Sequence, residues 1–358
     1  MKVFGESYQA GQIRRLIGRT QQIGGIRQGR FEGGPEDRAR FLQFETGTGL
    51  MFTVLPDRGM DIASTKYGGA SLSWDSPCGE VHPSFYEPQG LGWLRTFFGG
   101  LVCTCGLTWM GSPCVDEGIE LGLHGRYSHL PCRNLKVGEE WNGNECILWA
   151  EGEMRETVVF GVNVLLRRKI STALGSNTLT IEDTVTNEGF EATPHMLLYH
   201  INLGFPVVSP NSCLLSPAKQ VQPRDEEAAD GFERYNRFDD PQSGYKEKVY
   251  FHEMPSDRKG MVTVAVVNKG FQNRRGLGVM VRYRQKELPR FIQWKNMGTT
   301  TYVCGLEPAN ALVMGRAHER KHGKLQTLAA GETRQYRVEI GVLPDKAAIA
   351  EIEHTIRG

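Results

Sequence analysis

The segment HERKH at residues 318–322 has the spacing of a zinc protease motif, in which two histidines four residues apart share one helix face. There they would bind Zn²⁺ beside a glutamate that acts as a base. Gly315 and Gly323 bracket the motif, arginines and lysines surround it, and apart from Ala317 no apolar stripe accompanies it. Because a zinc-binding helix needs an apolar face to pack, the sequence instead predicts a solvated loop that binds no metal, ahead of a strand at 334–343.

Three other segments place a polar side chain where a strand-like run meets a loop marked by Gly or Pro: LGLHGRYSHLP with His124, TPHMLLYHINLGFPVVSP with His200, and YVCGLEPANA with Glu307. Functional sites tend to lie on loops that a rigid scaffold holds. A carboxylate at the end of a buried strand is costly to desolvate unless it has a partner or a function. Each segment alone also fits a structural role, as a hydrogen-bonded histidine in a turn or an exposed glutamate at a strand end.

His195 lies five residues before His200 and therefore at the opposite parity of the same strand. The two rings would face opposite sides of a sheet. The sequence predicts that His200 faces a site and that His195 has a structural role.

The elements that position these residues are expected to be strands, because short β-type runs lie between frequent Gly and Pro residues. In 178–187, Leu179, Ile181 and Val185 share one parity, which only Asp183 breaks. Residues 345–356, after Pro344, have the clearest helical pattern. Many strands and few helices predict two large antiparallel sheets. The runs are 49–56, 99–109, 145–150, 158–172, 178–187, 261–268, 277–284, 299–307 and 334–343.

Charge, length and cysteine usage limit the class of protein. The net charge of +1 among 358 residues gives no general attraction to nucleic acid or membranes. No apolar run approaches the ~18 residues of a membrane span, and the N-terminus lacks the apolar stretch of a signal peptide. Eight scattered cysteines favour buried free thiols in a reducing, cytoplasmic setting. Residues 218–247 are charged and predict a surface excursion that could form a lid.

An ordered set of motifs resembles a known family. TLTIEDTVTNEGFEATPHMLLYHINLGFP looks like the signature of the aldose 1-epimerases (galactose mutarotases), and GLHGR and YVCGLEPAN resemble two further motifs of that family in the same order. Together with LPDRGMDI and GGLVCTCGL, they resemble an uncharacterised bacterial branch over roughly 40–343. The resemblance implies an all-β supersandwich. We expect one domain over 1–358, with its core at about 40–343, an N-terminal extension and a short C-terminal helix.

The resemblance also implies an activity, the interconversion of the α and β anomers of an aldose without cofactor or metal. Glu307 would be the general base, His200 the general acid and His124 a sugar-binding residue. The Asn-Arg pair of galactose mutarotases is missing. PDRGMDI contains Arg58 and Asp61 instead, in a different sequence context. Further expected sugar contacts are Arg126, Asn202, and Gln293 or Trp294 according to strand register, with Trp109 and Tyr127 as lesser candidates.

The identity of the sugar is left open by the sequence. The family's sugar-binding Asp has no clear match, and Asp225, Asp230 and Asp239 are equivalent candidates within 218–247. Two arginines near one site, Arg58 and Arg126, favour an acidic or phosphorylated sugar.

Two other functions fit the same residues, a sugar lyase or isomerase on this fold and a carbohydrate-binding module without activity. The expected partner is a small sugar, with neither nucleic acid nor membrane. An exposed edge strand could also pair two copies into a homodimer.

Overall fold

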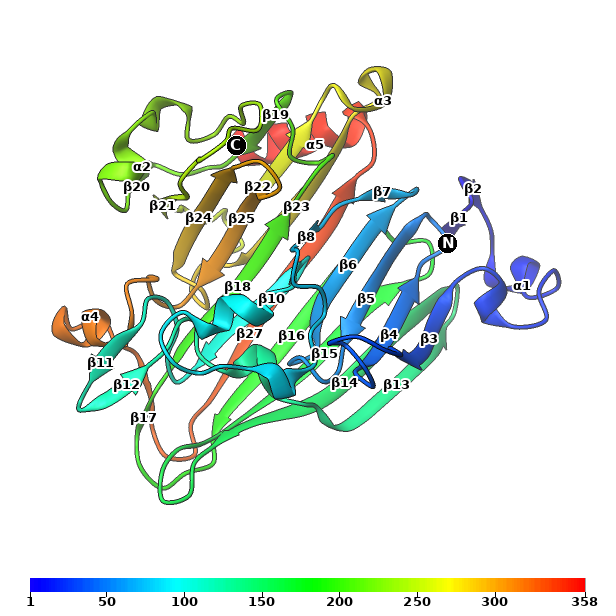
Figure 1. Ribbon diagram of the computed structural model, residues 1–358. Helices are drawn as coiled ribbons and strands as arrows, with labels where there is room; N and C mark the ends of the chain where they lie inside the picture. Colours follow the sequence, from blue (N-terminus) through cyan, green and yellow to red (C-terminus); the bar gives the residue numbers. More distant parts are fainter. Residues whose placement is uncertain (358) are drawn as a thin grey trace.

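Two large antiparallel sheets build the protein, and the computed structural model describes residues 1–357 (Figure 1). The larger sheet has the spatial order β20 (Gln220–Pro223), β21 (Lys248–Glu253), β24 (Arg290–Met297), β25 (Tyr302–Ala309), β18 (Met196–Leu203), β10 (Val102–Leu107), β6 (Asp61–Tyr67), β5 (Leu50–Leu55), β4 (Arg40–Glu45) and β3 (Gly25–Arg30), with β7 (Ala70–Ser71) paired to β6. The second sheet runs β13 (Arg133–Asn142), β14 (Glu145–Thr157), β15 (Asn163–Ala173), β16 (Thr178–Asn187), β27 (Thr333–Leu343), β23 (Leu277–Arg284), β22 (Met261–Asn268) and β19 (Ser212–Leu215).

Short strand pairs, α-helices and 3₁₀ turns accompany the two sheets. Four two-stranded pairs are β1 (Lys2–Val3) with β2 (Glu6–Ser7), β8 (Trp74–Asp75) with β9 (Gly99–Gly100), β11 (Cys114–Asp116) with β12 (Ile119–Leu121), and β17 (Thr193–Pro194) with β26 (Thr327–Leu328). The α-helices are α1 (Ala10–Ile13), α2 (Glu226–Ala229), α3 (Phe271–Arg274), α4 (Arg316–Lys321) and α5 (Lys346–Arg357). The 3₁₀ turns are η1 (Thr20–Gln22), η2 (Pro83–Phe85), η3 (Gly92–Thr96), η4 (Tyr127–His129) and η5 (Phe232–Arg234). None of the helices within residues 1–357 has the length and apolar character needed to cross a bilayer.

The predicted strand bounds agree best with the structure where apolar and polar residues alternate along the sequence. β16, β22 and β23 have the predicted bounds, because one side of each strand packs into the core. The run predicted at 158–172 begins as a strand only at Asn163, since the backbone N–H of Val158 bonds to the carbonyl of Val162 in a hairpin turn. The predicted C-terminal helix is confirmed as α5, which packs its buried Ile349 against the end of β22 and β23 (Figure 1).

β18 is buried on both faces, which explains its continuous apolar run. Leu197, Tyr199 and Ile201 point into the core between the two sheets. The opposite side of β18, which carries Leu198 and His200, lies under a second apolar cluster that includes Trp74, Trp93, Phe97, Phe98 and Met110. The sequence placed His200 at the end of this strand, whereas β18 continues to Leu203.

The loop predicted at HERKH is wrong, because residues 316–321 form α4. Arg316 and Arg320 both donate to the buried Asp116 of β11, so a long-range ion pair fixes this short helix beside the β11–β12 hairpin (Figure 1). The rings of His318 and His322 stack with centroids 4.1 Å apart, and His322 Nδ1 bonds to the His318 carbonyl. Within residues 1–357, no group of three or more His, Cys, Asp or Glu side chains could hold a metal ion.

The excursion at 218–247 wraps around the edge of the larger sheet. It contains β20, α2 and η5, which lie beside β21 (Figure 1). Gln293 Nε2 donates to the Tyr235 carbonyl at 2.8 Å, and Lys295 Nζ donates to the Arg234 carbonyl at 3.0 Å. Gln293 and Lys295 alternate with Trp294 on β24, so the middle of the excursion covers the face opposite to Trp294.

All eight cysteines are free, and five of them are buried, in agreement with the sequence. The division of the chain into one domain stays a prediction. The expected N-terminal extension contributes β3 to the larger sheet, so this sheet extends beyond the predicted core at 40–343.

Candidate active site

His200 and Glu307 lie side by side on neighbouring strands. Ile201 of β18 pairs with Leu306 of β25, and this register brings the adjacent His200 and Glu307 together on the same face of the sheet. Both residues are buried, and His200 Nε2 lies 3.2 Å from Glu307 Oε1. Among the described residues, neither Glu307 Oε1 nor His200 Nδ1 has a hydrogen-bond partner. Buried polar atoms without partners are rare in folded proteins, so this pair has capacity left for a ligand.

Gly305 preserves the space that the pair needs. It lies two residues before Glu307 on the same face of β25. A Cβ atom at this position would lie 2.6 Å from Glu307 Oε1 and 3.3 Å from His200 Cε1. Any side chain larger than glycine would therefore push against both polar residues.

His124 approaches the pair from the loop after β12. Its backbone has φ = 57°, and its N–H donates to the Gly111 carbonyl at 2.9 Å while its own carbonyl accepts from Gly106 at 3.1 Å. These bonds hold a left-handed conformation that is unusual for a side-chain-bearing residue. The His124 ring lies 5.9 Å from the His200 ring, and its buried Nδ1 has no partner among the described residues.

Aromatic rings surround the three polar residues in a cleft of about 420 Å³. The rings of Trp294 and Phe97 each lie 5.3 Å from the His200 ring, and Trp93 lies 4.7 Å from His124. The volume falls within the range of small-molecule sites.

A charged pair lies at the entrance of the cleft. The Trp294 indole N–H donates to Glu247 at 2.8 Å, and Arg224 lies 3.3 Å from the same carboxylate. Both charged residues line the cleft. They come from the two ends of the excursion at 218–247, which therefore contributes to the rim without covering the cleft with its middle.

Burial shifts the pKa values of the titratable residues in the cleft. It lowers the pKa of His200 to about 3, with a further contribution from His124, while Asn202 opposes the shift. Burial also lowers the pKa of His124 to about 4. The pKa of Glu307 is raised well above its usual value by burial and then by Glu247, with Arg224 opposing. At neutral pH these shifts favour a neutral His200 and a protonated Glu307, so the pair holds one titratable proton, on Glu307.

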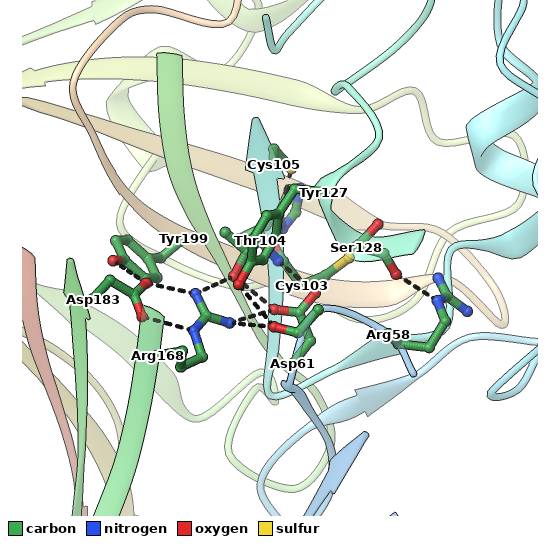
Figure 2. A network of polar contacts seen from close by, with 12 residues as sticks. Arg58, Asp61, Cys103, Thr104, Cys105, Tyr127, Ser128, Arg168, Asp183 and Tyr199 are labelled. Atoms are coloured by element: carbon green, nitrogen blue, oxygen red, sulfur yellow. Dashed lines mark hydrogen bonds and ion pairs between the residues drawn. The ribbon is translucent and has the colours of Figure 1, made fainter. Parts of the chain in front are cut away.

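Arg58 and Asp61 lie in the core, which corrects the expectation that they contact a sugar. Arg58 donates to the backbone carbonyls of Ser128 at 2.6 Å, Val81 at 2.6 Å and Thr96 at 2.8 Å, so its guanidinium is fully engaged. Asp61 accepts from Thr104 and from Arg168, which also binds Asp183 (Figure 2). Asp61 therefore joins β6 to β10 and to β15 of the second sheet, while Arg58 joins η3, η4 and the segment at Val81.

Three further expectations are corrected by strand geometry and packing. Ile292 and Trp294 face the cleft, so Gln293 points away and bonds to His252 at 3.1 Å. Asn202 is buried, and its amide nitrogen donates to the Gly99 and His200 carbonyls. Arg126 precedes η4, near Tyr86, outside the lining of the cleft.

The lesser candidates also have structural partners. The Trp109 indole donates to the Gly122 carbonyl at 2.9 Å, and the buried Tyr127 hydroxyl donates to the Gly59 carbonyl at 2.9 Å. His195 bonds to the Leu107 carbonyl and to the Tyr336 hydroxyl, which agrees with its predicted structural role.

The cleft residues that sequence reasoning did not find include two aromatic and two charged side chains: Trp93, Phe97, Arg224 and Glu247. The two aromatics had a weak signal, since they lie four residues apart shortly before Gly99 and Gly100. The three aspartates proposed within 218–247 do not line the cleft. Asp225 caps α2, Asp230 is exposed, and Asp239 pairs with Arg234.

A comparison with known protein families identifies the family of the chain. Residues 37–342 match the family described as a domain of unknown function, DUF4432. The chain belongs to this family. No match to a curated protein was found.

Solved structures share the fold. A protein from Klebsiella pneumoniae subsp. pneumoniae MGH 78578, described provisionally as an aldose 1-epimerase, is 26% identical with a TM-score of 0.88, over 93% of this chain and 86% of its own. A galactose mutarotase-like protein from Clostridium acetobutylicum is 12% identical with a TM-score of 0.61, over 90% and 99% of the two chains. The galactose 1-epimerase of Lactobacillus acidophilus NCFM is 11% identical with a TM-score of 0.57, over 89% and 98%.

These likenesses confirm the predicted fold class. The DUF4432 chain has the galactose mutarotase-like fold, and its structural neighbours include proteins described as aldose 1-epimerases.

Proposed function

We propose that the protein interconverts the α and β anomers of an aldose by acid–base opening of the sugar ring. The observation that carries this proposal is the separation of 3.2 Å between His200 and Glu307, two buried titratable groups within an aromatic cleft. The relatives of the same fold are described as aldose or galactose epimerases, which favours the same reaction class.

The reaction needs one proton donor and one proton acceptor beside a single hemiacetal. The acceptor removes the proton from the O1 hydroxyl, while the donor protonates the ring oxygen as the bond from C1 to O5 breaks. The open-chain carbonyl rotates about the bond between C1 and C2, and the ring then closes with the proton transfers reversed. The number of protons is conserved, and the chemistry requires neither metal nor cofactor.

The pair could begin from either distribution of its proton. Burial favours protonated Glu307 and neutral His200, in which case Glu307 donates to O5 and His200 accepts from O1. The roles expected from the sequence, with Glu307 as base, require one prior proton transfer across the 3.2 Å separation. Since opening and closing are mirror steps, each residue acts once as acid and once as base in every cycle.

His124 and Trp294 provide the binding surface. The unpartnered Nδ1 of His124 supplies a hydrogen bond to a sugar hydroxyl, and its ring is held neutral by burial. The indole of Trp294 suits the apolar face of a pyranose. Arg58 and Arg126 lie outside the cleft, and Arg224 is paired with Glu247, so the basis for preferring an acidic or phosphorylated sugar is removed.

The proposal is tested by NMR magnetisation transfer between the anomeric protons of reducing sugars. The panel contains neutral hexoses and pentoses, deoxy sugars, uronic acids and hexose 6-phosphates. Glu307→Gln removes the titratable carboxyl, and Glu319→Gln makes the same change at a buried glutamate in α4, away from the cleft.

The outcomes separate three functions. Accelerated exchange that is lost in Glu307→Gln and kept in Glu319→Gln supports the epimerase. New product signals would indicate a lyase or isomerase. Sugar binding without exchange or product would indicate a carbohydrate-binding module, and either result would overturn the proposal.

A further inference from the structure

Besides the charged pair of Arg224 and Glu247, the entrance of the cleft has an apolar part that extends into solvent. Leu91 and Leu94, beside and within η3, line its mouth with 60% and 47% of their surfaces exposed. The walls behind them are formed by Phe97, Val249, Ile292 and Trp294. Exposed leucines at the mouth of a concave site are available to an apolar part of a ligand.

The polar groups of the cleft are few, and most of them are already engaged. Arg224 donates to Asp225 and lies against Glu247, which also accepts from Trp294. Ser112 donates to the Val313 carbonyl at 3.1 Å. The unpartnered buried atoms of the cleft, among the described residues, are on Trp93, His124, His200 and Glu307.

These four free polar groups lie near one another in the cleft. The acid–base pair is occupied by O1 and O5 of the sugar during the reaction, which leaves His124 and the Trp93 indole N–H for two further hydroxyls. A hydroxyl directed towards Leu91 and Leu94 would lie against leucine and aromatic side chains, where it loses water without gaining a partner. A methyl or methylene group at the same position would gain contact with those side chains.

We infer that the substrate is a deoxy aldose, in which a methyl or methylene group replaces a hydroxyl. This inference rests on the proposed function, since it concerns the substrate class of the same site. The polar pair and His124 hold the hemiacetal end, and the deoxygenated edge contacts the apolar wall that ends at Leu91 and Leu94.

Matched sugar pairs test the inference. The pairs are D-fucose with D-galactose, L-rhamnose with L-mannose, and 2-deoxy-D-glucose with D-glucose, and kcat/KM for anomer exchange is measured by NMR for each member. For the preferred pair, the deoxy sugar should exceed its parent by about 10- to 100-fold, the usual discrimination by an apolar pocket.

The same measurements distinguish a wrong substrate assignment from a wrong proposed function. Exchange on the parent sugars with equal or greater kcat/KM would overturn the deoxy assignment and leave the epimerase proposal in place. Exchange on no sugar of the panel would overturn the epimerase proposal and the substrate assignment together.

A variant at the mouth locates the source of the preference. Leu94→Gln replaces an exposed apolar side chain by a polar one that can bond to a hydroxyl, so the deoxy-to-parent ratio should fall at least about fivefold. Leu16→Gln makes the same change at an exposed leucine outside the cleft, 68% exposed, and should leave the ratio unchanged. An unchanged ratio in a folded Leu94→Gln protein would contradict the assignment of the preference to the apolar mouth.

Discussion

Two buried polar clusters share the strands of the larger sheet and lie on its opposite faces. β18 contributes Tyr199 to a network between the two sheets and His200 to the cleft on the other side. In the network, Arg168 donates to Asp183 at 2.7 Å and to Asp61 at 2.9 Å, and the Tyr199 hydroxyl donates to Asp183 (Figure 2). In the cleft, buried atoms of His200 and Glu307 lack such partners among the described residues.

The difference between the clusters distinguishes a structural role from a functional one. Arg168 meets two carboxylates in a fully buried position, so its donors are used and the sheets are held in register. The cleft pair keeps a titratable proton and unfilled hydrogen-bonding capacity, which are features of sites that bind and react. The following variants should therefore damage one cluster without the other.

The largest effect on rate is expected from Glu307→Gln. Loss of the proton-transfer group should lower kcat for anomer exchange by about 10²- to 10⁴-fold. Stability should be kept or increased, because the change removes a buried group whose charged form is costly. Exchange kinetics and urea denaturation of the same preparation measure both quantities, and a loss of stability above ~2 kcal/mol would indicate a structural role instead.

The largest effect on stability is expected from Arg168→Met. Removal of the guanidinium leaves Asp61 and Asp183 buried without their counter-charge, which should cost about 3–5 kcal/mol of unfolding free energy. Denaturant unfolding measures the loss. Exchange per folded molecule should stay within a few-fold of the original, and an undiminished unfolding free energy would show that the network does not hold the sheets together.

The acid limb of the pH profile of kcat should lie at a lower pH than the titration of an exposed histidine. His200 has a pKa of about 3 and so stays neutral through the weakly acidic range, while Glu307 keeps its proton above its usual pKa. The pair should hold one proton across neutral pH, lose activity on the acid side only as His200 takes up a second proton, and lose it on the alkaline side as Glu307 ionises. An acid limb centred near pH 6.5 in a pH–rate profile would contradict the buried, neutral state of His200.

The smallest effect is expected from Arg126→Gln. Arg126 belongs to neither cluster and does not line the cleft. A substitution away from both should change kcat/KM by less than about twofold, corresponding to the ~0.5 kcal/mol scale of surface changes. A decrease of tenfold or more on an anionic sugar, measured beside a neutral one, would place Arg126 at the substrate.

The sequence predicted the local elements of the fold better than the partners of its charged residues. Strand β16 had its predicted bounds because alternation alone determines which face is buried. Asp183 was noticed because it breaks that alternation. Its partner Arg168, on the neighbouring strand, is not distinguished by spacing from the adjacent Arg167.

In the candidate site, too, local sequence patterns were predictive and contacts between distant segments were not. His200 and Glu307 were found because each lies on a strand that leads into a marked loop, and the order of the motifs agreed with a family. Arg58 was misassigned because its three carbonyl partners come from distant segments. Arg224 and Glu247 were missed because the two ends of a charged excursion meet only in the folded protein. The helix at HERKH was missed because Asp116, which stabilises it, lies 200 residues from Arg316.

The most direct test of the account compares anomer exchange in the original protein, Glu307→Gln and Arg168→Met at equal concentrations of folded molecules. The account predicts accelerated exchange on at least one aldose, abolished by Glu307→Gln and retained within a few-fold by Arg168→Met. Exchange that survives in Glu307→Gln, or that is absent from the original protein on every aldose, would contradict it.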